Sequence, residues 1–298
     1  METRRAVAIL AIAALLASVA TILAVYPPEK QYALRSWNVL AKDYPSESVH
    51  FEVSLGAARV VLKQLDTADV IVDVDARYRA YGPQPVLQAK EMGSALYVTI
   101  KTEEPVLGLP ESPADNYTLY LGRYGRPTSM RLNGRAIAAT LQLEELPLKE
   151  LSIDIGAGSL EIDLTDYRNP VSCSANLSVG GATLRAAGLG NLNFTDLSVK
   201  VGAAAATLDF TGDSKPANSQ ARVEAGVSTV NIYLPKDWGC RLSSRVLGTL
   251  NLDSTWMLVS EAGGRKEYKT SGYDEASRTI RLILDAGVAT IDIQRLSE

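Results

Sequence analysis

Six short blocks of alternating apolar and polar residues, each built around one glycine, constrain this chain more than any other sequence feature. The first block runs from Leu151 to Leu164 and alternates on both sides of Gly156. Apolar residues at every second position form the buried face of a strand, and the residues between them form the solvent face. Each block therefore predicts two short strands joined by a bend. The glycines at the bends are Gly156, Gly180, Gly202, Gly226, Gly248 and Gly287.

The spacing between these glycines predicts how the strand pairs are arranged. Successive glycines lie 24, 22, 24, 22 and 39 residues apart. A period of about 23 residues with two strands and two turns is typical of a β-solenoid, in which each coil stacks on the previous one. A glycine suits the corner because the backbone there needs positive φ or close approach. The long last interval predicts a hairpin or loop inserted at Glu261–Ser277, and evenly spaced hairpins of an antiparallel sandwich are the alternative.

The residues before Leu151 are also rich in β-strand patterns but do not keep this period. Short runs dense in Val, Ile, Leu and Thr are separated by Pro and Gly, which indicates strands with turns between them. We therefore expect an irregular β-rich segment over residues 49–150 and regular solenoid repeats over residues 151–298. Residues 27–48 are interpreted as a stalk that includes a candidate helix over Gln31–Lys42. The strand-like runs are Phe51–Leu55, Arg59–Leu62, Val70–Ala76, Ala95–Lys101 and Tyr117–Leu121.

The N-terminus predicts a single membrane anchor. Residues 6–26 are apolar except for Ser18 and Thr21, and at 1.5 Å per residue a helix of this length spans about 31 Å, close to the hydrocarbon core of a bilayer. Arg4 and Arg5 predict that residues 1–5 are cytoplasmic and that everything after the anchor lies outside the cell. The expected location is thus the cell membrane, with the lipid bilayer as a partner of residues 6–26. A signal peptide cleaved after Ser18-Val-Ala is the alternative.

Composition excludes several classes of function. The net charge of −4, without any run of Lys and Arg, offers no source of attraction to nucleic acid. One histidine, His50, and two cysteines, Cys173 and Cys240, are too few for a typical structural zinc site. At three coils apart, the cysteines would be separated by about 14 Å, while a disulfide needs Cα atoms within about 4.4 to 6.8 Å. We expect unpaired, buried thiols.

The search for catalytic residues leaves one enzymatic alternative. No Gly-x-Ser-x-Gly motif or phosphate-binding loop is present, and His50 is the only histidine available to a catalytic triad. Solenoid-shaped polysaccharide lyases and hydrolases use carboxylates and arginine, and the nearest approximation here is Glu161 and Asp163 with Arg185 one coil onward. Alternating charge on an exposed strand explains the same residues. We therefore expect no enzyme, no catalytic site and no cofactor.

Outward acidic residues raise the question of calcium. Asp154, Glu161, Asp163 and Asp209 lack a compact oxygen-rich loop, so a solvated sheet face is favoured over a metal site. Sequons at Asn116, Asn176 and Asn193 suit an exported protein if the host glycosylates.

The blocks Leu151–Leu164 and Leu284–Ile293 resemble the repeat of the toast-rack and putative-adhesin β-helix families, which include extracytoplasmic parts of LiaF-like cell-envelope proteins. The resemblance covers about Leu151–Gln294 and implies a noncatalytic role in adhesion or in sensing envelope stress. One predicted membrane span, where LiaF-like proteins have several, is a departure from that family. The expected protein is a membrane-anchored adhesin, scaffold or envelope-sensing module that binds a protein or glycan on the cell exterior.

Overall fold

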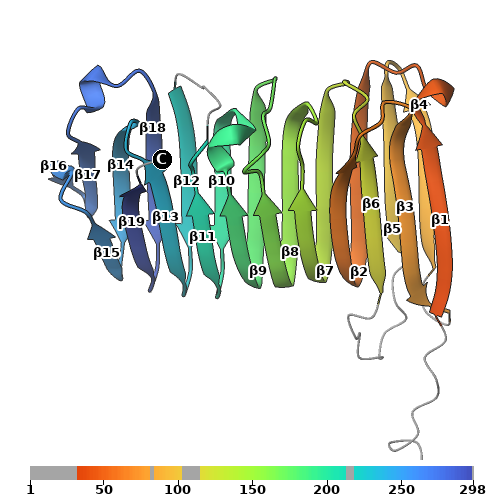
Figure 1. The fold of residues 1–298 in the computed structure, drawn as a ribbon. Helices are drawn as coiled ribbons and strands as arrows, with labels where there is room; N and C mark the ends of the chain where they lie inside the picture. The colour runs from red at the N-terminus through yellow and green to blue at the C-terminus, as the bar shows by residue number, and fades with distance from the viewer. Residues whose placement is uncertain (1–31, 81–83, 103–114, 213–217, 297–298) are drawn as a thin grey trace, which may run out of the picture.

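Stacked coils of parallel β-strand build the protein. The computed structural model describes residues 32–80, 84–102, 115–212 and 218–296. These residues form 19 strands and three short 3-10 helices, and none of them lies in an α-helix. Figure 1 shows the strands side by side in one elongated stack. The predicted all-β fold is confirmed, and the parallel pairing of the coils excludes the antiparallel sandwich.

Four long strands show how a coil is made, because each turns a corner near its middle. The part before the corner pairs in one sheet and the part after it in a second sheet, as β9 does with β10 and then with β11. We call these sheets face A and face B. The long strands are β2 (Ser48–Leu65), β7 (Thr128–Gln142), β8 (Leu148–Asp163) and β9 (Cys173–Ala187). Face A adds β5 (Ala95–Thr102), β10 (Phe194–Val201), β12 (Asn218–Ala225), β18 (Thr279–Ala286) and β14 (Gly239–Val246). Face B adds β6 (Asn116–Gly122), β11 (Ala205–Asp209), β13 (Thr229–Pro235), β19 (Thr290–Leu296) and β15 (Thr249–Leu252).

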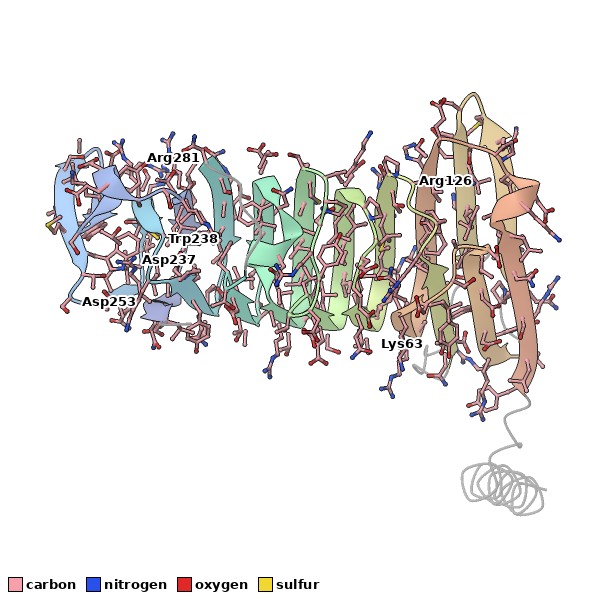
Figure 2. All side chains as sticks on the ribbon, turned by 45° about the horizontal axis from the view of Figure 1, so that its top comes forward. Lys63, Arg126, Asp237, Trp238, Asp253 and Arg281 are labelled. Atoms are coloured by element: carbon pink, nitrogen blue, oxygen red, sulfur yellow. The ribbon has the colours of Figure 1, made fainter. Side chains whose placement is uncertain are left out.

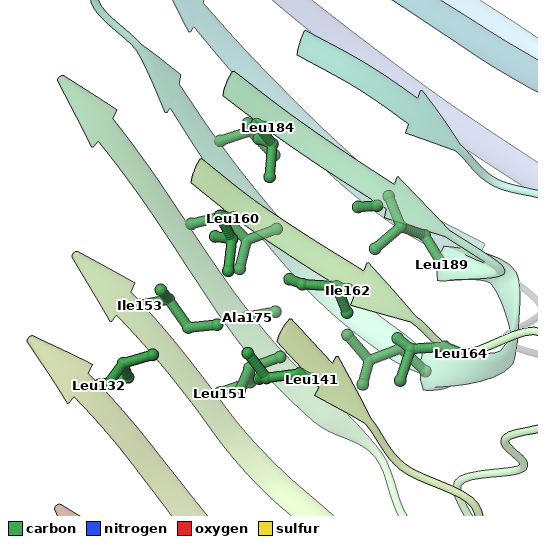
Figure 3. Close-up of a cluster of buried hydrophobic side chains, with 14 of the residues drawn as sticks. Leu132, Leu141, Leu151, Ile153, Leu160, Ile162, Leu164, Ala175, Leu184 and Leu189 are labelled. Atoms are coloured by element: carbon green, nitrogen blue, oxygen red, sulfur yellow. The ribbon is translucent and has the colours of Figure 1, made fainter. Parts of the chain in front are cut away.

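The core lies between the two faces and consists of ladders of aliphatic side chains. Leu132, Ile153, Leu177 and Val199 pair in register on four successive coils and are buried. Figure 3 shows part of this cluster, in which Leu160 from face B lies between Ile153 from face A and Leu184 on the next coil. Each fully buried aliphatic side chain contributes roughly 1.5 to 3 kcal/mol, so the ladders are the main stabilising element of the stack.

Glycines occupy the corner between the faces because neighbouring coils approach too closely there for a side chain. A Cβ built on Gly180 would lie 2.5 Å from the carbonyl oxygen of Gly156, and one on Gly202 would lie equally close to that of Gly180. Neither glycine has positive φ, so close approach and not backbone freedom explains them. We call the row Gly156, Gly180, Gly202, Gly226 and Gly287 the glycine ladder. Gly248 was predicted to belong to this row, but Leu247 takes the corner position, where its backbone N–H donates a hydrogen bond to the carbonyl oxygen of Ala286. The corner between β14 and β15 is therefore one residue shorter than the corner between β18 and β19.

The coils do not stack in the order of the sequence. The last coil, β18 and β19, lies between the coil of β12 and β13 and the coil of β14 and β15. At the other end, β2 lies between β7 and the coil of β5 and β6. The expectation that each coil stacks on the previous one is wrong at both ends. The strands of different coils show similar alternation, so this pattern does not specify which neighbour each coil takes.

Antiparallel strands cover both faces at the N-terminal end of the stack and face A at the C-terminal end. Face A ends in β4 (Pro85–Met92) at one end and in the hairpin β17 (Arg265–Thr270) and β16 (Trp256–Ala262) at the other. Face B starts with β1 (Tyr32–Leu40) and β3 (Val70–Arg79). The inserted hairpin predicted for the C-terminal region is confirmed, although it begins at Trp256. The 3-10 helices are η1 (Ala41–Asp43), η2 (Leu189–Leu192) and η3 (Tyr273–Glu275).

Two predicted boundaries in the N-terminal half are wrong. The candidate helix over Gln31–Lys42 is strand β1, because β3 offers it an antiparallel partner that the local sequence does not reveal. Most of the predicted stalk is therefore part of the fold: residues 32–40 form β1, residues 41–43 form η1, and Ser48 begins β2. The regular coils also begin before Leu151, since β2 and β7 pair in register through both halves. Long connections through β3 to β6 hide this register in the sequence.

The predicted anchor, residues 6–26, lies outside the described residues. Within the residues that are described, no helix is long and apolar enough to cross a bilayer.

The edge opposite the corner, which we call the loop edge, is held by buried asparagines. Asn169 accepts a hydrogen bond from the Leu148 N–H at 3.2 Å and donates to the carbonyl oxygens of Leu148 and Leu192 at 2.7 and 2.9 Å. Asn191 donates to the carbonyl oxygens of Leu164 and Thr165. These amides satisfy backbone groups in turns that no ladder covers, and they join successive coils.

Candidate functional sites on the coil surfaces

Face B presents a regular polar surface to solvent. Its outward side chains align in rows because the parallel strands pair without a shift in register. One row beside the corner is almost entirely hydroxyl-bearing, and the next row along the strands mixes hydroxyls, amides and single charges. The first row contains Ser159, Thr183, Ala205, Thr229, Thr290 and Thr249. The second contains Thr140, Glu161, Arg185, Thr207, Asn231, Asp292 and Asn251.

The structure brings the three candidate catalytic residues to the same part of face B. Glu161 and Arg185 are register partners on adjacent coils, and Asp163 follows two residues along β8. All three are exposed. A hydrogen bond from the Thr165 hydroxyl, with a second from its backbone N–H, holds the pKa of Asp163 below its usual range. A general acid needs a pKa raised toward neutrality, so Asp163 is tuned in the opposite direction.

The four acidic residues considered for calcium do not converge. Asp154 precedes the corner and belongs to face A, whereas Glu161 and Asp163 belong to face B. Asp209 lies on β11, two coils from Asp163. Among the described residues, no group of three or more His, Cys, Asp or Glu side chains could hold a metal ion.

His50 and the two cysteines have structural surroundings. His50 lies on face A and stacks on Tyr97 of the neighbouring strand, with ring centroids 4.6 Å apart. Cys173 and Cys240 are buried and unpaired, as predicted. Burial raises the pKa of each thiol to about 12, which makes both poor nucleophiles. They lie four coils apart, not three, because β18 is inserted between β12 and β14.

The sequons occupy different environments. Asn176 is exposed on face A, and Asn116 is half-buried on β6. Asn193 has positive φ and donates a hydrogen bond to the carbonyl oxygen of Asn169.

A hollow runs along face A beside the glycine ladder, and sequence reasoning did not find it. Its floor is backbone because Gly180, Gly202 and Gly226 carry no side chains. Charged side chains from four adjacent strands, β10, β12, β18 and β14, line the hollow. They are Lys200, Arg222, Glu224, Asp285 and Arg245.

Three guanidinium groups share the carboxylate of Asp285, which lines this hollow. Asp285 accepts ion pairs from Arg265 at 2.6 Å, Arg245 at 3.3 Å and Arg222 at 3.5 Å. Glu224 lies 3.7 Å from Lys200. We call these four cations and two carboxylates the ionic cluster, which carries a surplus of two positive charges, four minus two. Figure 2 shows the side chains that project from the C-terminal coils, with Arg281 labelled on β18, four residues before Asp285. The sequence does contain a signal for this cluster, because Glu224 and Asp285 each lie two residues before a glycine of the glycine ladder.

Stacked coils of parallel strands with two polar faces and a glycine corner define an all-β solenoid. The family model described as "N-terminal domain of toast_rack, DUF2154" matches residues 30–185. The chain therefore belongs to the toast-rack family, as the repeat blocks indicated. The match covers the N-terminal coils, whereas the resemblance in the sequence was strongest from Leu151 onward.

Other comparisons give matches of low identity and low TM-score. A search of curated proteins finds no match. A "putative cell adhesion protein" of known structure from Clostridium sporogenes is 16% identical with a TM-score of 0.44, over 89% of this chain and 100% of that one. A "putative adhesin" from Bacteroides fragilis is 14% identical with a TM-score of 0.35, over 90% and 99% of the two chains.

Proposed function

We propose that this protein is a membrane-anchored, extracytoplasmic and noncatalytic binding module that acts as an adhesin or scaffold. The observation that carries the proposal is the outward surface of face B, where rows of Ser, Thr and Asn with single charges extend over many coils. A flat array of hydroxyls and amides supplies repeated hydrogen-bonding groups for contact with a protein or glycan. An envelope-sensing role would use the same surface to bind its partner.

The arrangement of charged groups supports binding over catalysis. On face B, Glu161, Asp163 and Asp292 have no second carboxylate as a register partner, and Asp163 has a lowered pKa that opposes a role as general acid. At the hollow, Asp285 is shared by three arginines and is committed to ion pairs. The polysaccharide lyase or hydrolase alternative would need one of these carboxylates to be free to exchange a proton with substrate.

The anchor and the exterior location rest on residues 1–26. The apolar length of residues 6–26 and the basic residues before it support one span with a cytoplasmic N-terminus. The C-terminal domain would then be presented outside the cell.

Topology is the first test of the proposal. Intact cells carrying a C-terminal tag are treated with protease, and membranes are then extracted with alkaline carbonate. We expect the tag to be digested from outside while the untreated protein stays in the extracted membranes. A protected tag, or a protein released as soluble, would contradict the anchored exterior module.

A second measurement separates binding from catalysis. The variant Asp163→Asn keeps the size and exposure of the side chain while removing its charge. We expect cell-surface binding by Asp163→Asn to match the wild type, whereas a carbohydrate-active enzyme that uses Asp163 would lose turnover of its polysaccharide by orders of magnitude.

A further inference from the structure

Large aliphatic side chains project from the corner at the C-terminal end of the stack. Val227, Val288 and Leu247 lie on three neighbouring coils and are 68%, 70% and 82% exposed. Earlier coils carry Ala157 and Ala203 just after their ladder glycines. The exposed side chains contribute little to the core, so folding does not explain why they are large and apolar.

Members of the ionic cluster lie two or three residues before these aliphatic side chains along the chain. Glu224 and Asp285 precede Val227 and Val288 by three residues, and Arg245 precedes Leu247 by two. Apolar groups at the tip of the corner with a surplus of cations behind them form the pattern by which a protein surface docks on an anionic bilayer.

The first described residue lies at the same edge of the molecule. The strand register can be followed across face B from one strand to the next. It starts at Leu34 on β1, passes through Arg77, Asn116 and Arg59, and continues coil by coil to Thr229 on β13, so Leu34 and Thr229 lie at the same level. Tyr32, two residues earlier, is therefore level with Val227 at the corner. Figure 1 shows β1 at the opposite end of the stack from β13 and β19. The chain thus enters the fold at the corner edge, far along the stack from the aliphatic side chains.

The distance from the predicted span to Tyr32 is short. Six residue steps separate Tyr26 from Tyr32, which allows at most about 20 Å. Face B extends from β1 to β15 over ten strand spacings, which is about 48 Å. An anchored solenoid either stands away from the bilayer or lies along it on the corner edge.

We propose that the solenoid lies on its corner edge, with Val227, Val288 and Leu247 in the interface of an anionic bilayer and the ionic cluster against lipid headgroups. This inference rests on the proposed membrane anchor and adds the orientation of the domain. Face B and the loop edge then remain available to exterior partners.

Fluorescent labelling of the full-length chain tests this orientation. Single cysteines are introduced as Val288→Cys at the corner or Asp166→Cys at the exposed loop edge, and each is labelled with an environment-sensitive dye. The native thiols are buried and do not compete for the label. The protein is reconstituted into vesicles of phosphatidylcholine, alone or mixed with phosphatidylglycerol, that carry a spin-labelled lipid as quencher.

We expect strong quenching of the dye at residue 288 with phosphatidylglycerol present, and weak quenching at residue 166. The double variant Arg222→Gln, Arg245→Gln should lower the docking equilibrium constant by roughly 25-fold, since each basic residue near an anionic surface contributes about a factor of five. Arg131→Gln on face A, which breaks the exposed pair with Glu150, is the matched control and should have no effect.

Three results would overturn the inference: equal quenching at residues 288 and 166, quenching that ignores phosphatidylglycerol, or loss of docking in Arg131→Gln. Carbonate extraction of the same vesicles tests the anchor separately. A chain that resists extraction but shows no quenching at residue 288 retains the anchor and refutes the orientation, whereas an extractable chain refutes the anchor.

Discussion

The glycine ladder offers a sharp test of how the coils are held together. In β9, Gly180 and Gly181 are consecutive, exposed and free of positive φ. A Cβ on Gly180 would lie 2.5 Å from the carbonyl oxygen of Gly156, whereas a Cβ on Gly181 would meet the same oxygen at 4.0 Å. The obstacle at Gly180 is backbone and cannot rotate away.

The two alanine variants should therefore change stability in opposite directions. Gly180→Ala must push two coils apart, which costs about 1 to 3 kcal/mol as overpacking does elsewhere. Gly181→Ala meets ordinary contact distances and restricts the unfolded chain, which stabilises by about 0.4 to 1 kcal/mol. At about 2 to 4 °C per kcal/mol, Gly180→Ala should melt roughly 2 to 12 °C below the wild type.

Thermal unfolding of the full-length protein in detergent, followed by tryptophan fluorescence, measures this difference. Repeat proteins can unfold in more than one step, so the midpoints are compared between variants and are not converted into absolute stabilities. Equal midpoints for Gly180→Ala and Gly181→Ala would refute close approach as the reason for the ladder. A melting point of Gly180→Ala above that of the wild type would refute it as well.

Three further predictions concern single groups. Cys173 and Cys240 should resist maleimide in the folded protein at pH 7 and react fully in denaturant; fast reaction of either folded thiol would contradict its burial. Asn169→Leu should destabilise by about 1 to 3 kcal/mol for each backbone group left unpaired, measured by denaturant midpoint, and an unchanged midpoint would show that water replaces the amide. Thr165→Val should raise the pKa of Asp163 toward its usual range in an NMR titration. Because the pKa of Asp163 is lowered in the folded state, ionised Asp163 stabilises the fold at pH values above its unfolded pKa. This stabilisation is lost as the pH falls through the folded pKa, and the loss should be smaller in Thr165→Val.

Features that depend on neighbouring residues could be predicted from the sequence. Alternation around Gly156 specifies strands on both sides of a bend, and the surplus before Gly287 specifies an inserted hairpin. The exposed positions of Glu161, Asp163 and Arg185 follow from the same alternation. Their roles do not, because the pKa of Asp163 depends on the turn at Thr165.

Features that depend on the choice of a distant partner could not be predicted. Tyr32–Leu40 contains no decisive signal for a strand, and β3 makes it one by pairing with it. The ionic cluster needs Asp285 to lie between Glu224 and Arg245, an order that the sequence does not contain.

The amino-acid sequence by itself determined the local unit of this protein: the strand, the glycine corner, the buried side of each coil and the absence of a recognisable catalytic motif. These properties depend on alternation and steric fit within about one coil of chain. Only the tertiary structure decided the order of the coils, the covered ends and the surface that brings Arg222, Arg245 and Asp285 together. The physical reason is that coils with similar alternation offer similar ladders to one another, so the choice among them is made by the packing of the whole stack.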